Sequence, residues 1–120
     1  MPPEYDPEKV VLQVACTDYE AGSNLVSAIL GNMATMVGKE ANLAAGKAEP
    51  ALGWTFYPLS VDKEFVRRLA GLPENDIMRM KGTTLEQKFA VWLNRQLESR
   101  AEGVRVQLLS DLKSSQFGLF

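Results

Sequence analysis

The side chains that most often carry out enzyme chemistry are scarce in this chain. Its 120 residues include no histidine and one cysteine, Cys16. Histidine is the commonest general acid or base, the usual activator of serine and cysteine nucleophiles, and the usual ligand of catalytic zinc. Without it, catalysis would depend on carboxylates, lysines or a cofactor. The composition therefore favours a protein that is not an enzyme, and we predict no catalytic residue, metal site or cofactor.

Cys16 ends the apolar run VVLQVAC, at residues 10–16. A reactive thiol needs a base or a helix terminus beside it, and a single cysteine has no partner for an internal disulfide. We therefore predict that Cys16 is a small buried apolar residue. Nothing in the cysteine usage is typical of a secreted protein, so we expect a cytoplasmic location.

Two other chemical patterns are incomplete. Gly46-Lys47 lacks the first glycine and the following serine or threonine of a phosphate-binding Walker loop. Glu98 and Glu102 are four residues apart, which places both on one exposed helix face. Neither pattern indicates phosphate binding or general acid-base catalysis.

Basic residues of the second half of the chain suggest a surface for nucleic acid. They are Arg67, Arg68, Arg79, Lys81, Lys88, Arg95 and Arg100. Acidic residues are mixed among them, and the formal net charge is −2. The pattern therefore favours solvated faces with ion pairs, and nucleic acid remains the weaker of the partners considered.

Residues 116–120, with the sequence QFGLF, are the best candidate for a binding function. Gln116, Leu119 and Phe120 give this stretch a pattern that resembles the bacterial sliding-clamp-binding peptide: glutamine, an aliphatic residue, a small or acidic residue, leucine and phenylalanine. Phe117 departs from it, because an aliphatic side chain is more usual there. The resemblance implies that the glutamine hydrogen-bonds at the rim of a clamp pocket, which the Leu-Phe pair fills.

A second interpretation of the same stretch needs no clamp. Phe117, Leu119 and Phe120 would be a liability if exposed without a partner. They are therefore also expected to pack on the protein itself, for instance as an edge strand after residues 104–109, or on another copy. In the clamp interpretation, the polar residues 110–115 (SDLKSS) would serve as a tether. The sequence leaves both interpretations open and favours the docked segment.

Three segments are predicted to form strands: Val10–Cys16, Trp54–Tyr57 and Val104–Leu109. The first is rich in β-branched residues, although a helix is the alternative there. The second places Trp54 and Phe56 on one face and is predicted to end at Pro58. Aromatic side chains of this kind can stack nucleic-acid bases, but no basic residue is interleaved with them, so we expect packing.

A long helix is predicted over residues 18–45, from apolar residues at helical spacing. Gly31 and Gly38 each cost about 1 kcal/mol against alanine inside a helix. Either the helix packs closely on another helix through small residues, as across a dimer, or it breaks near one of the glycines. Gly31, Met33, Met36 and Gly38 are therefore candidate oligomer-interface residues. The uncharged stretch 21–38 is too polar for a membrane span, so no membrane is expected.

Two further helices are predicted, over residues 60–70 and 84–100. The second has an apolar stripe at helical spacing, and either Thr83 with Glu86 or Thr84 with Gln87 fits the capping box. Gly103 lies where a C-terminal cap glycine is expected. A loop is expected over Ala44–Gly53.

Together these elements predict an α+β fold, with about three helices packed on a small sheet of about three short strands. The alternative is a mainly α fold. One globular domain is expected over residues 1–115, followed by the apolar peptide 116–120. We predict a small cytoplasmic interaction protein that forms a homo-oligomer, as a phage or mobile-element protein could, or docks its own apolar segment. The alternative is an adaptor of bacterial replication or repair that the sliding clamp recruits.

Overall fold

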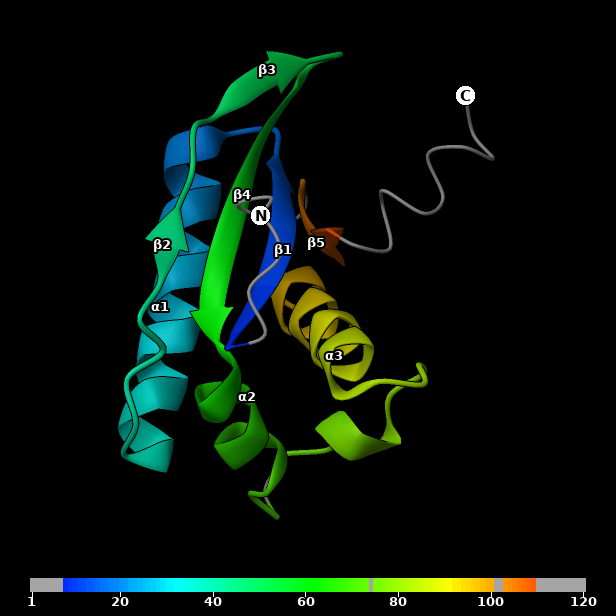
Figure 1. Cartoon of the computed structure of the whole chain (residues 1–120). Coiled ribbons are helices and arrows are strands. Elements are labelled where there is room, and N and C mark those ends of the chain that lie inside the picture. The colour runs from blue at the N-terminus through cyan, green and yellow to red at the C-terminus, as the bar shows by residue number, and fades with distance from the viewer. Residues whose placement is uncertain (1–7, 74, 101–102, 110–120) are drawn as a thin grey trace.

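A computed structural model of the chain describes residues 8–73, 75–100 and 103–109 and has the predicted α+β class (Figure 1). In the described residues the elements are β1 (Lys9–Cys16), α1 (Tyr19–Val37), β2 (Ala44–Ala45), β3 (Glu49–Ala51), β4 (Trp54–Asp62), α2 (Lys63–Ala70), a 3-10 turn (Ile77–Arg79), α3 (Leu85–Glu98) and β5 (Val104–Leu108). Residues 10–16 are strand rather than helix. The sheet has five strands, more than the three predicted.

The strands lie in the order β2–β4–β1–β5, with β3 also paired to β4, and every pairing is antiparallel. When β2 and β3 are taken as one interrupted strand, this is the order of a split β-α-β motif. Strand β1 is central, because it pairs with β4 along its whole length on one side and with β5 over Leu12–Cys16 on the other. The first and last described strands are therefore neighbours.

The helices and the sheet form two layers. Alternate residues of β1, β4 and β5 are buried against the helices: Val10, Leu12, Val14, Cys16, Tyr57, Leu59, Val61, Val104, Val106 and Leu108. They share one core with the buried residues of α1, α2 and α3, and Figure 1 shows α1 passing behind β2. The period of two along each strand thus puts its apolar set on the helix side.

Strand β4 runs through Pro58, where the sequence predicted its end. Proline has no N–H to donate to a ladder, so it is normally confined to positions without a paired donor. Here the Pro58 carbonyl accepts from Gly46 N at 2.8 Å, so the proline nitrogen also faces that side. The missing N–H therefore falls where the pairing of β2 with β4 ends, in the gap between β2 and β3. A Cβ on Gly46 would lie 2.5 Å from the Pro58 ring, so this approach requires glycine.

The long helix ends earlier than predicted. Gly38 adopts a left-handed conformation (φ 68°) and its N–H donates to Ala34 O at 3.0 Å, which is a glycine C-cap. The predicted break near Gly38 is confirmed, and the prediction of helix to residue 45 is wrong. The loop expected over Ala44–Gly53 instead contains β2, β3 and a two-residue hairpin turn.

The two later helices also differ at their ends. Helix α2 begins at Lys63 rather than at residue 60, because residues 60–62 continue the pairing of β4 with β1. Thr84 caps α3 in a capping box with Gln87, which decides between the two predicted pairs. Gly103 is not the C-cap of α3, whose cap is Ser99. It starts β5 with a positive φ of 76°, where a Cβ would overlap the Thr17 side chain.

Candidate binding surface on the open face of the sheet

No described element covers the sheet face opposite the helices. We call it the open face and define it by the outward residues of three strands and by Leu109, which follows β5: Lys9, Val11, Gln13, Ala15, Trp54, Phe56, Pro58, Ser60, Asp62, Arg105, Gln107 and Leu109. Those of β1 are all half-buried, whereas the inward residues of the same strand are fully buried. The sequence alternation of β1 and β5 produces this difference, because adjacent side chains point to opposite faces.

A hollow on the open face reaches from β4 to Asn94 at the β5 edge, and one side chain in its floor is small. Ala15 pairs with Phe56 on one side and with Arg105 on the other. Directly paired residues point to the same face, so a methyl group stands between an aromatic ring and a guanidinium. The resulting hollow has a volume of about 270 Å³, and Trp54 also lines it.

A second hollow adjoins the first along the same face. Gln13 lines both of them, between Pro58 of β4 and Gln107 of β5. The second hollow measures about 490 Å³ and extends to Val11 of β1 and to Leu109, which follows β5. The two hollows therefore run along the sheet towards the point where residues 110–120 begin.

The residue types around the hollow at Ala15 resemble those at the centres of protein interfaces. Aromatic side chains and arginine are enriched at the centres of such interfaces, whereas lysine and carboxylates are depleted. Trp54, Phe56 and Arg105 fit this composition, and Gln13 and Gln107 add amides. Arg105 is the one cation that lines the two hollows, and Lys9 at the end of the face is paired with Asp62, whereas single-stranded nucleic acid needs several cations along its path. The face thus suits a protein segment better than a nucleic acid.

Helix α3 covers the outer edge of the sheet at β5. The Asn94 amide donates to Val106 O at 2.6 Å and accepts from Val106 N at 2.8 Å. An edge strand normally leaves such groups free to pair with another strand. Asn94 occupies the middle of this edge, so it opposes the predicted addition of an edge strand after β5.

The residues of the predicted binding peptide, Gln116, Phe117, Leu119 and Phe120, lie outside the described residues, as does the tether at 110–115. Sequence reasoning assigned Trp54 and Phe56 to packing and did not single out Ala15 or Arg105. The alternation in β1 and β5 was the available signal, but the neighbours across strands depend on the register.

The candidate oligomer-interface residues of α1 do not share one surface. Met33 packs against the core, and Gly38 is the C-cap. Met36 is 54% exposed, and a Cβ on Gly31 would meet nothing within 4 Å. Close packing at Gly31 is therefore not used within the described chain.

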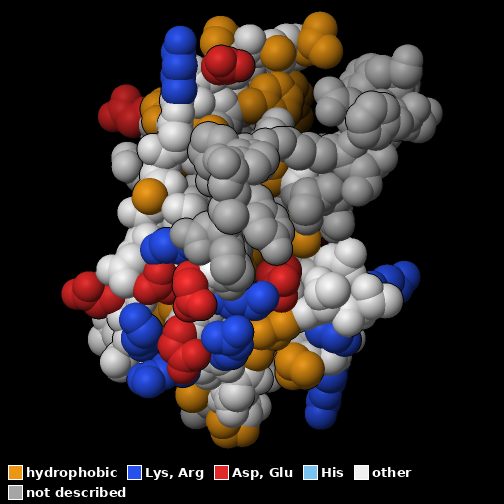
Figure 2. All heavy atoms as spheres, viewed as in Figure 1, with side chains coloured by type: hydrophobic (Ala, Val, Ile, Leu, Met, Phe, Trp, Pro, Cys, Tyr) orange, Lys and Arg blue, Asp and Glu red, His pale blue; other side chains and the backbone are white. Residues whose placement is uncertain are grey.

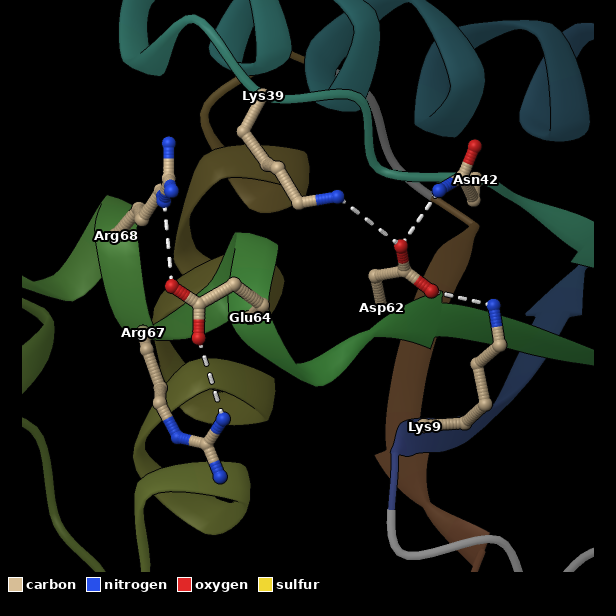
Figure 3. A network of polar contacts seen from close by, with 7 residues as sticks. All are labelled: Lys9, Lys39, Asn42, Asp62, Glu64, Arg67 and Arg68. Atoms are coloured by element: carbon tan, nitrogen blue, oxygen red, sulfur yellow. Dashed lines mark hydrogen bonds and ion pairs between the residues drawn. The ribbon is translucent and has the colours of Figure 1, made fainter.

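A network of charged side chains lies where β4 meets α2 (Figure 3). Asp62 accepts hydrogen bonds from Lys9 and from Asn42, the latter at 2.5 Å, and Lys39 Nζ lies 3.5 Å away. These hydrogen bonds, that from Lys9 foremost, lower the pKa of Asp62 to about 2. Asp62 is thus held ionised and ties the start of β1 to the segment after α1.

Glu64 lies beside this network and bonds to Arg67 and Arg68 of its own helix. Hydrogen bonds from Arg68 and then from Arg67 lower the pKa of Glu64. Figure 2 shows charged side chains of both signs over this part of the molecule, whereas apolar side chains gather at the β3–β4 hairpin. Because Asp62 and Glu64 are both paired with cations, neither is poised as a general base near neutral pH.

The buried thiol and phenol of the core are also unsuited to chemistry. Cys16 is fully buried, as predicted, and burial and then the charge of Asp18 raise the pKa of its thiol. Burial likewise raises the pKa of Tyr57. In the described ranges, no group of three or more acidic, cysteine or histidine side chains could hold a metal ion. Nor is any helix there long and apolar enough to cross a membrane.

No known protein family, curated protein or solved structure matches this chain. The arguments for function therefore rest on the geometry of the open face and on the sequence.

Proposed function

We propose that this protein is a non-enzymatic cytoplasmic interaction module, and that the open face binds an apolar protein segment. The segment comes from a second copy of the chain or from its own residues 116–120. The observation that carries the proposal is the hollow at Ala15, flanked by Phe56 and Arg105 on a sheet face that no described element covers. Its volume of about 270 Å³ is slightly below the usual range of small-molecule pockets, which favours side chains of a protein over a small molecule.

Burial of the aromatic side chains supplies the driving force. Trp54 and Phe56 are only half-buried in the described chain. Completing the burial of a large apolar side chain contributes on the order of 1 kcal/mol or more. Aromatic residues and arginine are also the usual energetic hot spots of protein interfaces.

Self-association is tested by sedimentation of the full chain over a range of concentrations. If the bound segment comes from a second copy, the chain forms a concentration-dependent dimer that the double variant W54S/F56S abolishes. Met36→Ser, an exposed substitution on α1, is the matched control and should leave the dimer intact. If Met36→Ser dissociates the dimer and W54S/F56S does not, the interface lies on α1 and the proposal is wrong. A chain that remains monomeric at all concentrations excludes the second copy and leaves docking of residues 116–120.

The resemblance of residues 116–120 to a clamp-binding peptide supports a second proposal, an adaptor recruited by the bacterial sliding clamp. Purified clamp should then bind the full chain in surface plasmon resonance, and Gln116→Ala and Phe120→Ala should each weaken binding at least tenfold. Leu43→Ala, outside the peptide, serves as the control. The absence of binding by the unsubstituted chain would exclude this second proposal.

A further inference from the structure

We propose that the chain's own residues 116–120 occupy the hollow at Ala15, with Phe117 and Leu119 against Trp54 and Phe56. This inference rests on the proposed function and names the occupant of the open face. In an extended segment, residues two apart point to the same side, so Phe117 and Leu119 can enter one hollow together.

The length of the intervening chain allows this arrangement. Leu109 lines the second hollow with Val11, so residue 110 begins at the rim of the open face. Ala15 lies four residues from Val11 along β1, a distance of about 13 Å. Residues 110–115 span up to about 20 Å when extended, and so can turn back along the face and deliver residue 116 to the hollow.

The edge of β5 is a poorer site for the same segment. A strand added there would need the N–H and C=O of Val106, and Asn94 holds both of them. Displacing the Asn94 amide would leave its polar groups to find new partners, at a cost of about 1–3 kcal/mol if they remain buried and unpaired. The open face requires no such exchange.

The composition of the segment matches the face. Residues 116–120 carry no charged side chain, and the face offers aromatic rings with the Gln13 and Gln107 amides beside them. Residues 1–7 also lie outside the described ranges, but they contain Glu4 and Asp6 and are less apolar. The residues that line the hollow include a single cation, Arg105, so residues 1–7 with their two carboxylates fit it less well.

Docking of this kind would regulate the open face. A partner that binds at Trp54 and Phe56 must first displace residues 116–120. The same displacement would expose those residues, so the face and the segment become available together.

Trp54 fluorescence tests the inference in the full chain. The second tryptophan, Trp92, is buried in the core, and Trp92→Phe removes its signal. In this background, F117S/L119S/F120S should shift the Trp54 emission maximum to longer wavelength, because the ring becomes solvated. A synthetic peptide of residues 110–120 should reverse the shift saturably when added to the triple-serine variant. The same peptide with the three serines should not.

Proteolysis provides a second measurement with a matched pair of variants. Ala15→Gln fills the hollow without adding charge, whereas Ala28→Gln makes the same change on the exposed side of α1. Chymotrypsin cleavage after Phe117 should be at least tenfold faster in the Ala15→Gln variant than in the unsubstituted chain, and unchanged in Ala28→Gln. Equal cleavage rates in all three would overturn the inference.

Other occupants give different results. An emission shift that depends on protein concentration would assign the segment to a second copy and overturn docking within one chain. If deletion of residues 1–7, rather than F117S/L119S/F120S, shifts the Trp54 emission, residues 1–7 occupy the face and the inference is wrong. An oligonucleotide that quenches Trp54 equally well with and without the triple substitution would also overturn it.

In the first two cases the open face still binds a protein segment, so the proposed function survives. If an oligonucleotide quenches Trp54, and neither the triple substitution nor the deletion of residues 1–7 changes the Trp54 emission, both the inference and the proposed function are refuted.

Discussion

The two faces of the central strand β1 differ in what covers them, although they alternate along one stretch of eight residues. On the helix side, Val10, Leu12, Val14 and Cys16 are at most 1% exposed. On the open face, Val11, Gln13 and Ala15 are half-buried and line hollows. Burial against the helices thus stabilises the sheet. The side chains on the opposite face do not contribute to this packing, although several of them are apolar. Substitutions that separate stability from binding test this division.

The largest expected effect comes from the covered face. Leu12→Ala removes a fully buried side chain and should lower the free energy of unfolding by about 3 kcal/mol, from lost burial and the cavity it leaves. Its neighbour Val11 faces the other way, and Val11→Ala should cost less than about 1 kcal/mol. Urea denaturation of both variants measures the difference. Equal losses would show that the open face is packed as tightly as the covered one.

A glycine on α1 gives the next largest effect. A Cβ on Gly22 would overlap the Cys16 side chain, so Gly22→Ala should cost about 2 kcal/mol. Cys16→Ala should relieve part of that loss in the double variant. Gly31→Ala is the control, since its Cβ meets nothing, and should stabilise the helix by about 1 kcal/mol. Thermal unfolding of the four variants measures the coupling, and strictly additive effects of Gly22→Ala and Cys16→Ala would refute the contact.

Asp62, opposite Lys9 at one end of the open face, provides a test by pH. Its pKa is lowered from 3.8 to about 2 in the folded protein. The carboxylate therefore contributes stability that is present above about pH 4 and is lost as the pH falls through 2. Solvent reaches this side chain, so we expect a contribution of about 1 kcal/mol. Asp62→Asn should flatten the stability profile between pH 4 and 2, with Glu64→Gln changing it less. An unchanged profile in Asp62→Asn would refute the network's role.

The smallest effect is expected at the β3–β4 hairpin, which extends beyond the helices at the top of Figure 1. Leu52 and Gly53 both have positive φ, 55° and 84°, as a type I′ turn requires, and Leu52 is 99% exposed. Asparagine tolerates this conformation better than leucine, so Leu52→Asn should stabilise the fold by about 0.5–1 kcal/mol. The control is Met78→Asn, at an exposed position without positive φ, where the urea midpoint should not rise. A midpoint that falls in Leu52→Asn would show that the leucine packs on something.

Local pattern was enough to predict several elements of this protein. The alternation of residues 104–108, the β-branched run at 10–16 and the capped apolar stripe of α3 each specify an element through contacts between near neighbours. The same pattern was insufficient at β2 and β3, which are two and three residues long. Strands that short carry almost no periodicity, and here they form because β4 offers an antiparallel partner.

The sequence by itself determined the class of fold, the buried state of Cys16 and the uncharged apolar composition of residues 116–120. The tertiary structure decided that β4 continues through Pro58, and that Ala15 stands between Phe56 and Arg105. Both depend on pairing between strands that are distant in the chain. Proline is tolerated at position 58 because its nitrogen, which has no N–H, faces the gap between β2 and β3, where the pairing of β2 with β4 ends. The hollow exists because register places one methyl group between two large side chains, and no local pattern encodes that register.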